Sequence, residues 1–197
     1  MEKLKIVIYG LVILFTLTGI LHAADLGESF LDLKWGTSIS ELPEFKKISE
    51  NGDVAYYRNP AKTYTVFEVE DPSVIYGFYK GKFFATYIQV GTYTVFERVK
   101  EHISKKFGEP KTTLKMKTRQ TIHQWKHQKI KIKLKLYELD GRMKLAFYYT
   151  QLSNQVNEAQ QEDFPAVSER EFTLDEGSKQ EIQKDLKLER ALNVMEF

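Results

Sequence analysis

Short runs of residues with high β-propensity recur between residues 54 and 149, and in several of them apolar and polar positions alternate. A period of two is the pattern of a β-strand with one buried face. Lys80-Gly81-Lys82 and Asp140-Gly141 lie between consecutive runs and predict hairpin turns. We therefore expect an antiparallel meander with strands near 54–58, 64–69, 74–79, 83–90, 114–117, 121–126, 129–137 and 142–149.

One segment in the middle of this pattern has the period of a helix instead. Phe96, Val99, Ile103 and Phe107 form a single apolar stripe at helical spacing. The flanking residues are types that begin and end helices: Thr94 with Glu97 as an expected capping box, then Lys105, Lys106, Gly108 and Pro110. The sequence predicts a helix from about residue 94 to residue 107.

A shorter helix is expected near residue 40. Ser38 followed by Glu41 has the spacing of a capping box, and the helix would continue through Leu42 and Phe45. Pro43 limits its length. Gly36-Thr37-Ser38 precedes this helix, and Gly91-Thr92-Tyr93 precedes the other one, 55 residues later. Strands follow each helix, so an internal duplication of a helix-plus-strands unit is one interpretation.

Together these elements predict an α+β fold, with an antiparallel meander sheet and two packed helices in one domain over residues 25–151. The remainder, residues 152–197, differs in composition, with 11 acidic and 5 basic residues counted from residue 151 onward. A helix opening at Thr173 and covering 174–194 has few apolar anchors: Ile182, Leu186, Leu188 and Leu192. We expect an acidic tail that is helical or disordered.

The first 24 residues predict export. A basic start is followed by 16 residues without charge, 6–21, and by His22-Ala23-Ala24. This is the pattern of a secretory signal peptide, cleaved after Ala23 or Ala24, and the apolar run is shorter than the roughly 20 residues of a spanning helix. With no cysteine and no Asn-x-Ser/Thr sequence, we expect a bacterial periplasmic or secreted protein that is not a lipoprotein. The rest of the chain has no second long apolar run, so we expect no transmembrane segment in the mature chain.

The most unusual pattern is Lys129-Ile130-Lys131-Ile132-Lys133-Leu134-Lys135-Leu136, which alternates strictly. On a strand, the apolar residues face the core and the lysines face the other side. If Leu114 and Met116 also face the core, the cations that alternate with them lie on the same side of the sheet as these lysines. The candidate binding residues are Lys115, Lys117, Lys129, Lys131, Lys133, Lys135, Arg142 and Lys144.

Residues 100–150 carry 14 basic and 4 acidic residues, so this part of the chain should attract anions. Three interpretations remain open. The lysines form an ordinary solvated face, the acidic tail docks on them, or they bind an anionic envelope component or an acidic protein. Export and the low overall charge exclude nucleic acid as the expected partner.

No catalytic motif, cofactor site or metal site is predicted. The chain contains no Gly-x-Ser-x-Gly, His-Glu-x-x-His or phosphate-loop sequence, and no cysteine nucleophile. His123 and His127 flank Trp125, but on a strand they lie roughly 13 Å apart, too far to share one ion. We expect Trp35 to pack in the core and Trp125 to pack in the core or at the sheet edge. The expected function is a non-enzymatic periplasmic binding or interaction module, with an envelope-directed hydrolase or an outer-membrane assembly factor as alternatives.

Two short motifs carry a family resemblance over about residues 30–151. Trp35-Gly36-Thr37-Ser38 opens the first half, and Phe107-Gly108-Glu109-Pro110 ends the second helix. This pattern resembles secreted bacterial α+β proteins, and the repeated plan is similar to the β-lactamase-inhibitor-protein fold and to the SmpA/OmlA outer-membrane assembly lipoproteins. The resemblance implies partner binding through the sheet face. It departs from the lipoproteins in one respect, because this chain has no cysteine to acylate.

Overall fold

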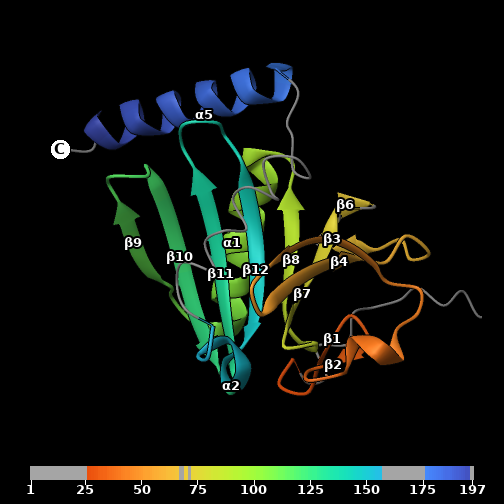
Figure 1. Cartoon of the computed structure of the whole chain (residues 1–197). Coiled ribbons are helices and arrows are strands. Elements are labelled where there is room, and N and C mark those ends of the chain that lie inside the picture. The colour runs from red at the N-terminus through yellow and green to blue at the C-terminus, as the bar shows by residue number, and fades with distance from the viewer. Residues whose placement is uncertain (1–25, 67–68, 71, 157–175, 196–197) are drawn as a thin grey trace, which may run out of the picture.

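The computed structural model describes residues 26–66, 69–70, 72–156 and 176–195. Its centre is an eight-stranded antiparallel sheet with the order β3-β4-β7-β8-β12-β11-β10-β9 (Figure 1). The strands are β3 (Lys46–Asn51), β4 (Val54–Arg58), β7 (Val74–Tyr79), β8 (Lys82–Val90), β9 (Lys111–Lys115), β10 (Gln120–His127), β11 (Ile130–Tyr137) and β12 (Met143–Tyr149). The predicted α+β class with an antiparallel sheet is confirmed.

Two small hairpins and four helical segments complete the described chain. The hairpins are β1 (Ser29–Phe30) with β2 (Leu33–Lys34), and β5 (Thr65–Val66) with β6 (Val69–Glu70). The helical segments are the 3-10 turn η1 (Ile39–Glu41) and the α-helices α1 (Tyr93–Phe107), α2 (Thr150–Ser153) and α5 (Glu176–Met195). Within the described ranges, no helix is long and apolar enough to cross a membrane.

The sheet has two faces with different coverage. On the face that we call the helix face, α1 lies across the strands and contacts β8 and β10 (Figure 1). Phe96, Val99 and Ile103 of α1 are buried there, as their spacing predicts, against apolar residues of all the central strands. The opposite face, which we call the lysine face, carries a second buried cluster built around tyrosines.

Helix α5 crosses one end of the strands, next to the β11–β12 hairpin (Figure 1). Ile182 and Leu186, two of the predicted anchors, are buried in the same cluster as α1. Gln183 donates a hydrogen bond from Nε2 to the carbonyl oxygen of Glu138, 2.8 Å away. Gly141 has a positive φ of 70°, and a Cβ there would lie 3.4 Å from Ile182 Cγ2, so the hairpin turn and the helix approach closely.

The expected N-cap Thr173 and the signal segment lie outside the described residues.

Several local expectations were wrong. The first helix is a single 3-10 turn that ends at Glu41, and the Glu41 carboxylate accepts a hydrogen bond from Ser38 N at 3.3 Å. The condition that Leu114 and Met116 are buried in the core is not met, because both side chains are exposed. The cap of α1 is Thr92 instead of Thr94, because Thr92 Oγ1 accepts a hydrogen bond from Val95 N at 3.2 Å.

The position of this cap gives a first testable expectation. Thr92→Ala should lower the free energy of unfolding by about 1 kcal/mol, because one backbone N–H at the helix start loses its acceptor. Thr94→Ala, inside the helix on an exposed position, should change it by less than about 0.5 kcal/mol. Urea unfolding of both variants measures the difference, and equal losses would contradict the assignment of Thr92 as the cap.

Candidate functional site

The candidate site is the lysine face, where strands β10, β11 and β12 present cations in register. Lys131 lies directly opposite Lys126 of β10, and Lys135 lies directly opposite Lys144 of β12. Lys133, between them on β11, pairs with Gln124 and Ala146. The strict alternation of β11 places all three of its internal lysines on this face, as the sequence predicts.

The lysines differ in their exposure to solvent. Lys126 is exposed, and Lys131 and Lys133 are half-buried. Lys135 is only 4% exposed and Lys144 only 2%. Two adjacent ammonium groups in a buried setting are unfavourable unless neighbouring groups stabilise the charge. The sequence did not predict this burial, because alternation gives the direction of a side chain and not what covers it.

Tyrosine rings lie beneath the cations. The Nζ atoms of Lys131 and Lys133 are 5.5 Å and 5.6 Å from the ring centre of Tyr148. Lys144 Nζ is 5.7 Å from the ring of Tyr87 and 5.4 Å from the ring of Tyr137. A cation over a ring face is worth about 0.5–1 kcal/mol at exposed sites and about 2 kcal/mol when desolvated. The rings therefore support the ammonium groups and limit where they can point.

These tyrosines form a tightly packed cluster of their own. Tyr87 makes edge contacts with Tyr56 and Tyr148, with ring centres 5.9 Å and 5.7 Å apart. Gly77 leaves room for the rings, since a Cβ there would lie 3.1 Å from a ring carbon of Phe84 and 3.3 Å from one of Tyr87. Burial raises the pKa of the Tyr87 hydroxyl well above its ordinary value. The base of the lysine face is therefore rigid.

The other four predicted residues lie around this centre. Lys115 is on the same face, at the edge strand β9, opposite Gln120. Arg142 lies over the ring of Tyr137 at 5.0 Å and pairs with Asp140 at 2.5 Å. Lys117 is in the β9–β10 turn. Lys129 is in the turn at the other end of β11, 3.8 Å from Glu28. The structure thus brings most of the predicted cations together and separates Lys117 and Lys129.

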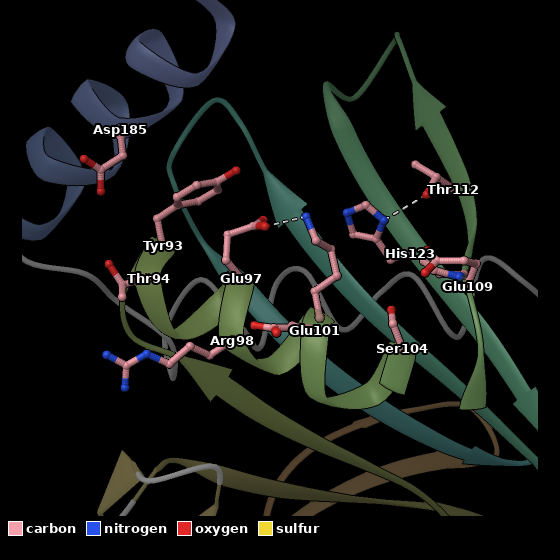
Figure 2. A pocket seen from close by; sticks show the side chains of 12 residues that line it. Tyr93, Thr94, Glu97, Arg98, Glu101, Ser104, Glu109, Thr112, His123 and Asp185 are labelled. Atoms are coloured by element: carbon pink, nitrogen blue, oxygen red, sulfur yellow. Dashed lines mark hydrogen bonds and ion pairs between the residues drawn. The ribbon is translucent and has the colours of Figure 1, made fainter. Parts of the chain in front are cut away.

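A second feature, which the sequence did not reveal, is a groove of about 960 Å³ on the outer side of α1 (Figure 2). It lies between α1, strands β9 and β10, and Asp185 of α5. Its acidic residues on α1 are engaged by lysines: Glu97 with Lys100 at 2.5 Å and Glu101 with Lys105 at 2.6 Å. The hydrogen bond from Lys105 holds the pKa of Glu101 below its usual value, the opposite of what a catalytic acid needs.

The histidines of β10 face this groove side of the sheet together with Trp125. His123 Nδ1 lies 2.9 Å from Thr112 Oγ1, as Figure 2 shows, and His127 packs against Phe107. Trp125 is buried and donates from Nε1 to the carbonyl oxygen of Gly108 at 2.8 Å, so its predicted core position is confirmed. Among the described residues, no group of three or more potential metal ligands comes together.

Trp35 packs as the sequence predicts, although it is not fully buried. Its ring stacks on Phe83 with centres 4.6 Å apart and on Tyr149 with centres 6.0 Å apart. Its Nε1 donates a hydrogen bond to the carbonyl oxygen of Leu26 at 2.9 Å. Two stacked rings and a hydrogen bond make this residue a structural anchor of the amino-terminal segment.

The residues of the lysine face can bind and orient an anion, since they supply charge and hydrogen-bond donors on a rigid base. In comparisons with known proteins, the chain matches no protein-family profile, no curated protein and no solved structure.

Proposed function

We propose that this chain is a non-enzymatic binding module that engages an anionic partner through the lysine face. One observation carries the proposal, namely the two pairs of lysines that lie directly opposite each other, Lys126 with Lys131 and Lys135 with Lys144. Like charges at directly opposed positions destabilise a sheet. Positions that break a local rule of stability in this way are those where function is expected.

The electrostatic setting supports the same proposal. The fields of several ammonium groups within one Debye length of each other add, which raises the local concentration of anions. The tyrosine rings below Lys131, Lys133 and Lys144 reduce the entropy lost when these side chains become fixed by a ligand. A face of this kind favours an extended anion over a single small one, because the cations are spread over three strands.

The site can be tested by reversing charge at the two half-buried positions. Lys131→Glu with Lys133→Glu should weaken binding to poly-L-glutamate by about a hundredfold, since a cation at such a surface contributes about 1 kcal/mol and each reversal also adds repulsion. Isothermal titration at two salt concentrations measures the affinity, and binding by the unchanged chain should weaken as salt increases.

The matched control is Lys46→Glu with Lys62→Glu, which makes the same change in net charge at exposed positions of the amino-terminal half. This control should retain affinity within about threefold. Circular dichroism establishes that both pairs fold. Equal losses in the two pairs, or no binding by the unchanged chain, would refute the lysine face as the site.

Two further parts of the proposal concern origin and compartment. The order β3-β4-β7-β8 followed by β12-β11-β10-β9 places two four-stranded meanders back to back, each preceded by a helical segment, which supports an internal duplication. The partner we propose is a molecule of the bacterial envelope, because the predicted signal peptide directs the chain there. The acidic tail contributes the docked helix α5 to the domain.

A further inference from the structure

Three large apolar side chains are exposed in the part of the chain that the structure describes, and all three lie at one end of the sheet. Leu114 is 62% exposed, Met116 82% and Leu139 65%. Leu114 is near the end of β9 and Met116 is in the β9–β10 turn, while Leu139 is in the β11–β12 turn. We call these three residues the hairpin-tip patch.

The two turns that carry the hairpin-tip patch are bonded to each other. Glu138 N donates a hydrogen bond to the carbonyl oxygen of Arg119 at 3.0 Å. Glu138 Oε1 accepts a hydrogen bond from Thr121 Oγ1 at 3.3 Å, and its other carboxylate oxygen lies 3.9 Å from Arg119 Nη2. These contacts join the β9–β10 turn to the β11–β12 turn, so their apolar side chains belong to one surface.

Helix α5 lies across this same end of the sheet (Figure 1). Its contacts there include the hydrogen bond from Gln183 to Glu138 and the packing of Ile182 against Gly141. Leu139 and Met116 are exposed although α5 is docked at this end, so the helix does not cover them. The apolar side chains therefore lie on short turns, and the packed helix α5 supports this end of the sheet.

Cations lie on one side of the hairpin-tip patch. Lys115, Lys117 and Arg119 are on the same strand end and turn as Leu114 and Met116. The acids of the turn that carries Leu139 are paired, Glu138 with Arg119 and Asp140 with Arg142. Apolar side chains next to lysine and arginine match the two layers of an anionic bilayer surface, which has apolar chains below negatively charged head groups.

We propose that the hairpin-tip patch inserts into the surface of an anionic lipid bilayer, with Lys115, Lys117 and Arg119 at the head groups. This inference goes beyond the proposed function, because it concerns one end of the sheet and not the lysine face, and it names an anionic membrane surface as the partner of that end. Association of two copies through the same patch is disfavoured, because it would bring the three cations of one copy against those of the other. The strands then stand on the membrane, and Lys129, at the far end of β11, lies away from it.

The test uses the chain from Asp25 onward, which contains every described residue and lacks the apolar segment 6–21 that would itself bind vesicles. Met116→Gln with Leu139→Gln changes no charge and should weaken binding to phosphatidylcholine vesicles containing phosphatidylglycerol by about tenfold or more. The same pair should leave binding to poly-L-glutamate unchanged. Sedimentation with vesicles and titration with the polymer provide the two measurements.

A matched pair of charge reversals tests the orientation. Lys117→Glu, next to the hairpin-tip patch, should weaken binding to the anionic vesicles by about fivefold, while Lys129→Glu, at the opposite end, should have a smaller effect. Met116→Trp adds a reporter, whose fluorescence should be quenched by brominated lipid. An unquenched tryptophan on bound protein, or equal effects of the two reversals, would overturn the inference.

The two proposals fail in different ways. Binding to poly-L-glutamate without binding to the anionic vesicles would overturn the membrane inference and leave the proposed function standing. Unchanged vesicle binding by the Met116 and Leu139 double variant would do the same. Absence of binding to both probes would overturn both proposals.

Discussion

Replacing Phe83 by alanine is expected to lower the free energy of unfolding by about 3–5 kcal/mol. Phe83 is completely buried, and its ring lies 4.6 Å from that of Trp35, 5.6 Å from that of Phe78 and 5.9 Å from that of Tyr76. Its backbone also holds the amino-terminal segment, since Gly36 N donates to its carbonyl oxygen at 2.8 Å. The truncation would leave a cavity among these three rings that cannot close without moving the sheet.

For a chain of this size, such a loss corresponds to a fall in Tm of roughly 6–20 °C. Differential scanning calorimetry and urea unfolding measure it. Phe83→Leu should cost less because most of the volume remains, and Leu114→Ala should change stability by less than about 0.5 kcal/mol because Leu114 is exposed. If Phe83→Ala lost no more than Leu114→Ala, the described aromatic core would be wrong.

Alkaline pH is expected to destabilise the folded chain steeply. Burial raises the pKa of Tyr76 and of Tyr87 above the ordinary value of a tyrosine, and for Tyr76 the hydrogen bond with the Tyr64 hydroxyl adds to this. Above about pH 10, the unfolded chain releases these two protons while the folded chain retains them. The folded state then binds more protons, so the free energy of unfolding falls as pH rises, by about 1.4 kcal/mol per pH unit for each tyrosine.

Urea unfolding at a series of pH values measures this slope, and absorbance at the tyrosinate band follows the protons in the folded state. Below about pH 9 these tyrosines should contribute no slope, because both states keep the protons. Tyr87→Phe should reduce the alkaline slope by about 1.4 kcal/mol per pH unit, the contribution of one tyrosine. An unchanged slope in this variant would show that Tyr87 does not titrate on unfolding.

Where local pattern and tertiary packing agreed, the sequence predicted the fold well. The stripe of Phe96, Val99 and Ile103 correctly predicted α1. Strict alternation correctly predicted β11 and the side of the sheet on which its lysines lie. The turns at Gly81 and Gly141 were also correct, because both positions have a positive φ that favours glycine. These features depend on residues close together in sequence.

Features that depend on distant parts of the chain could not be predicted. β3, Lys46–Asn51, is a polar edge strand with a bulge after Lys47, so it shows little apolar alternation. Three features arise from elements that the fold brings together. They are the burial of Lys135 and Lys144, the groove beside α1, and the clustering of Leu114, Met116 and Leu139. Alternation in β9 suggested a buried Leu114, but β9 is the edge of the sheet and extends beyond the cover of α1.

The pairing of β8 with β12 has a consequence for the chain as it emerges from the ribosome. β8 ends at Val90 and its partner β12 begins only at Met143, so the amino-terminal meander is complete long before its inner edge can be paired. That edge is nine residues long, and most of its side chains are apolar or aromatic. An unpaired edge of this kind is a template for contact with other chains. A holding chaperone that keeps β8 apart until β12 arrives would therefore favour the yield of folded protein.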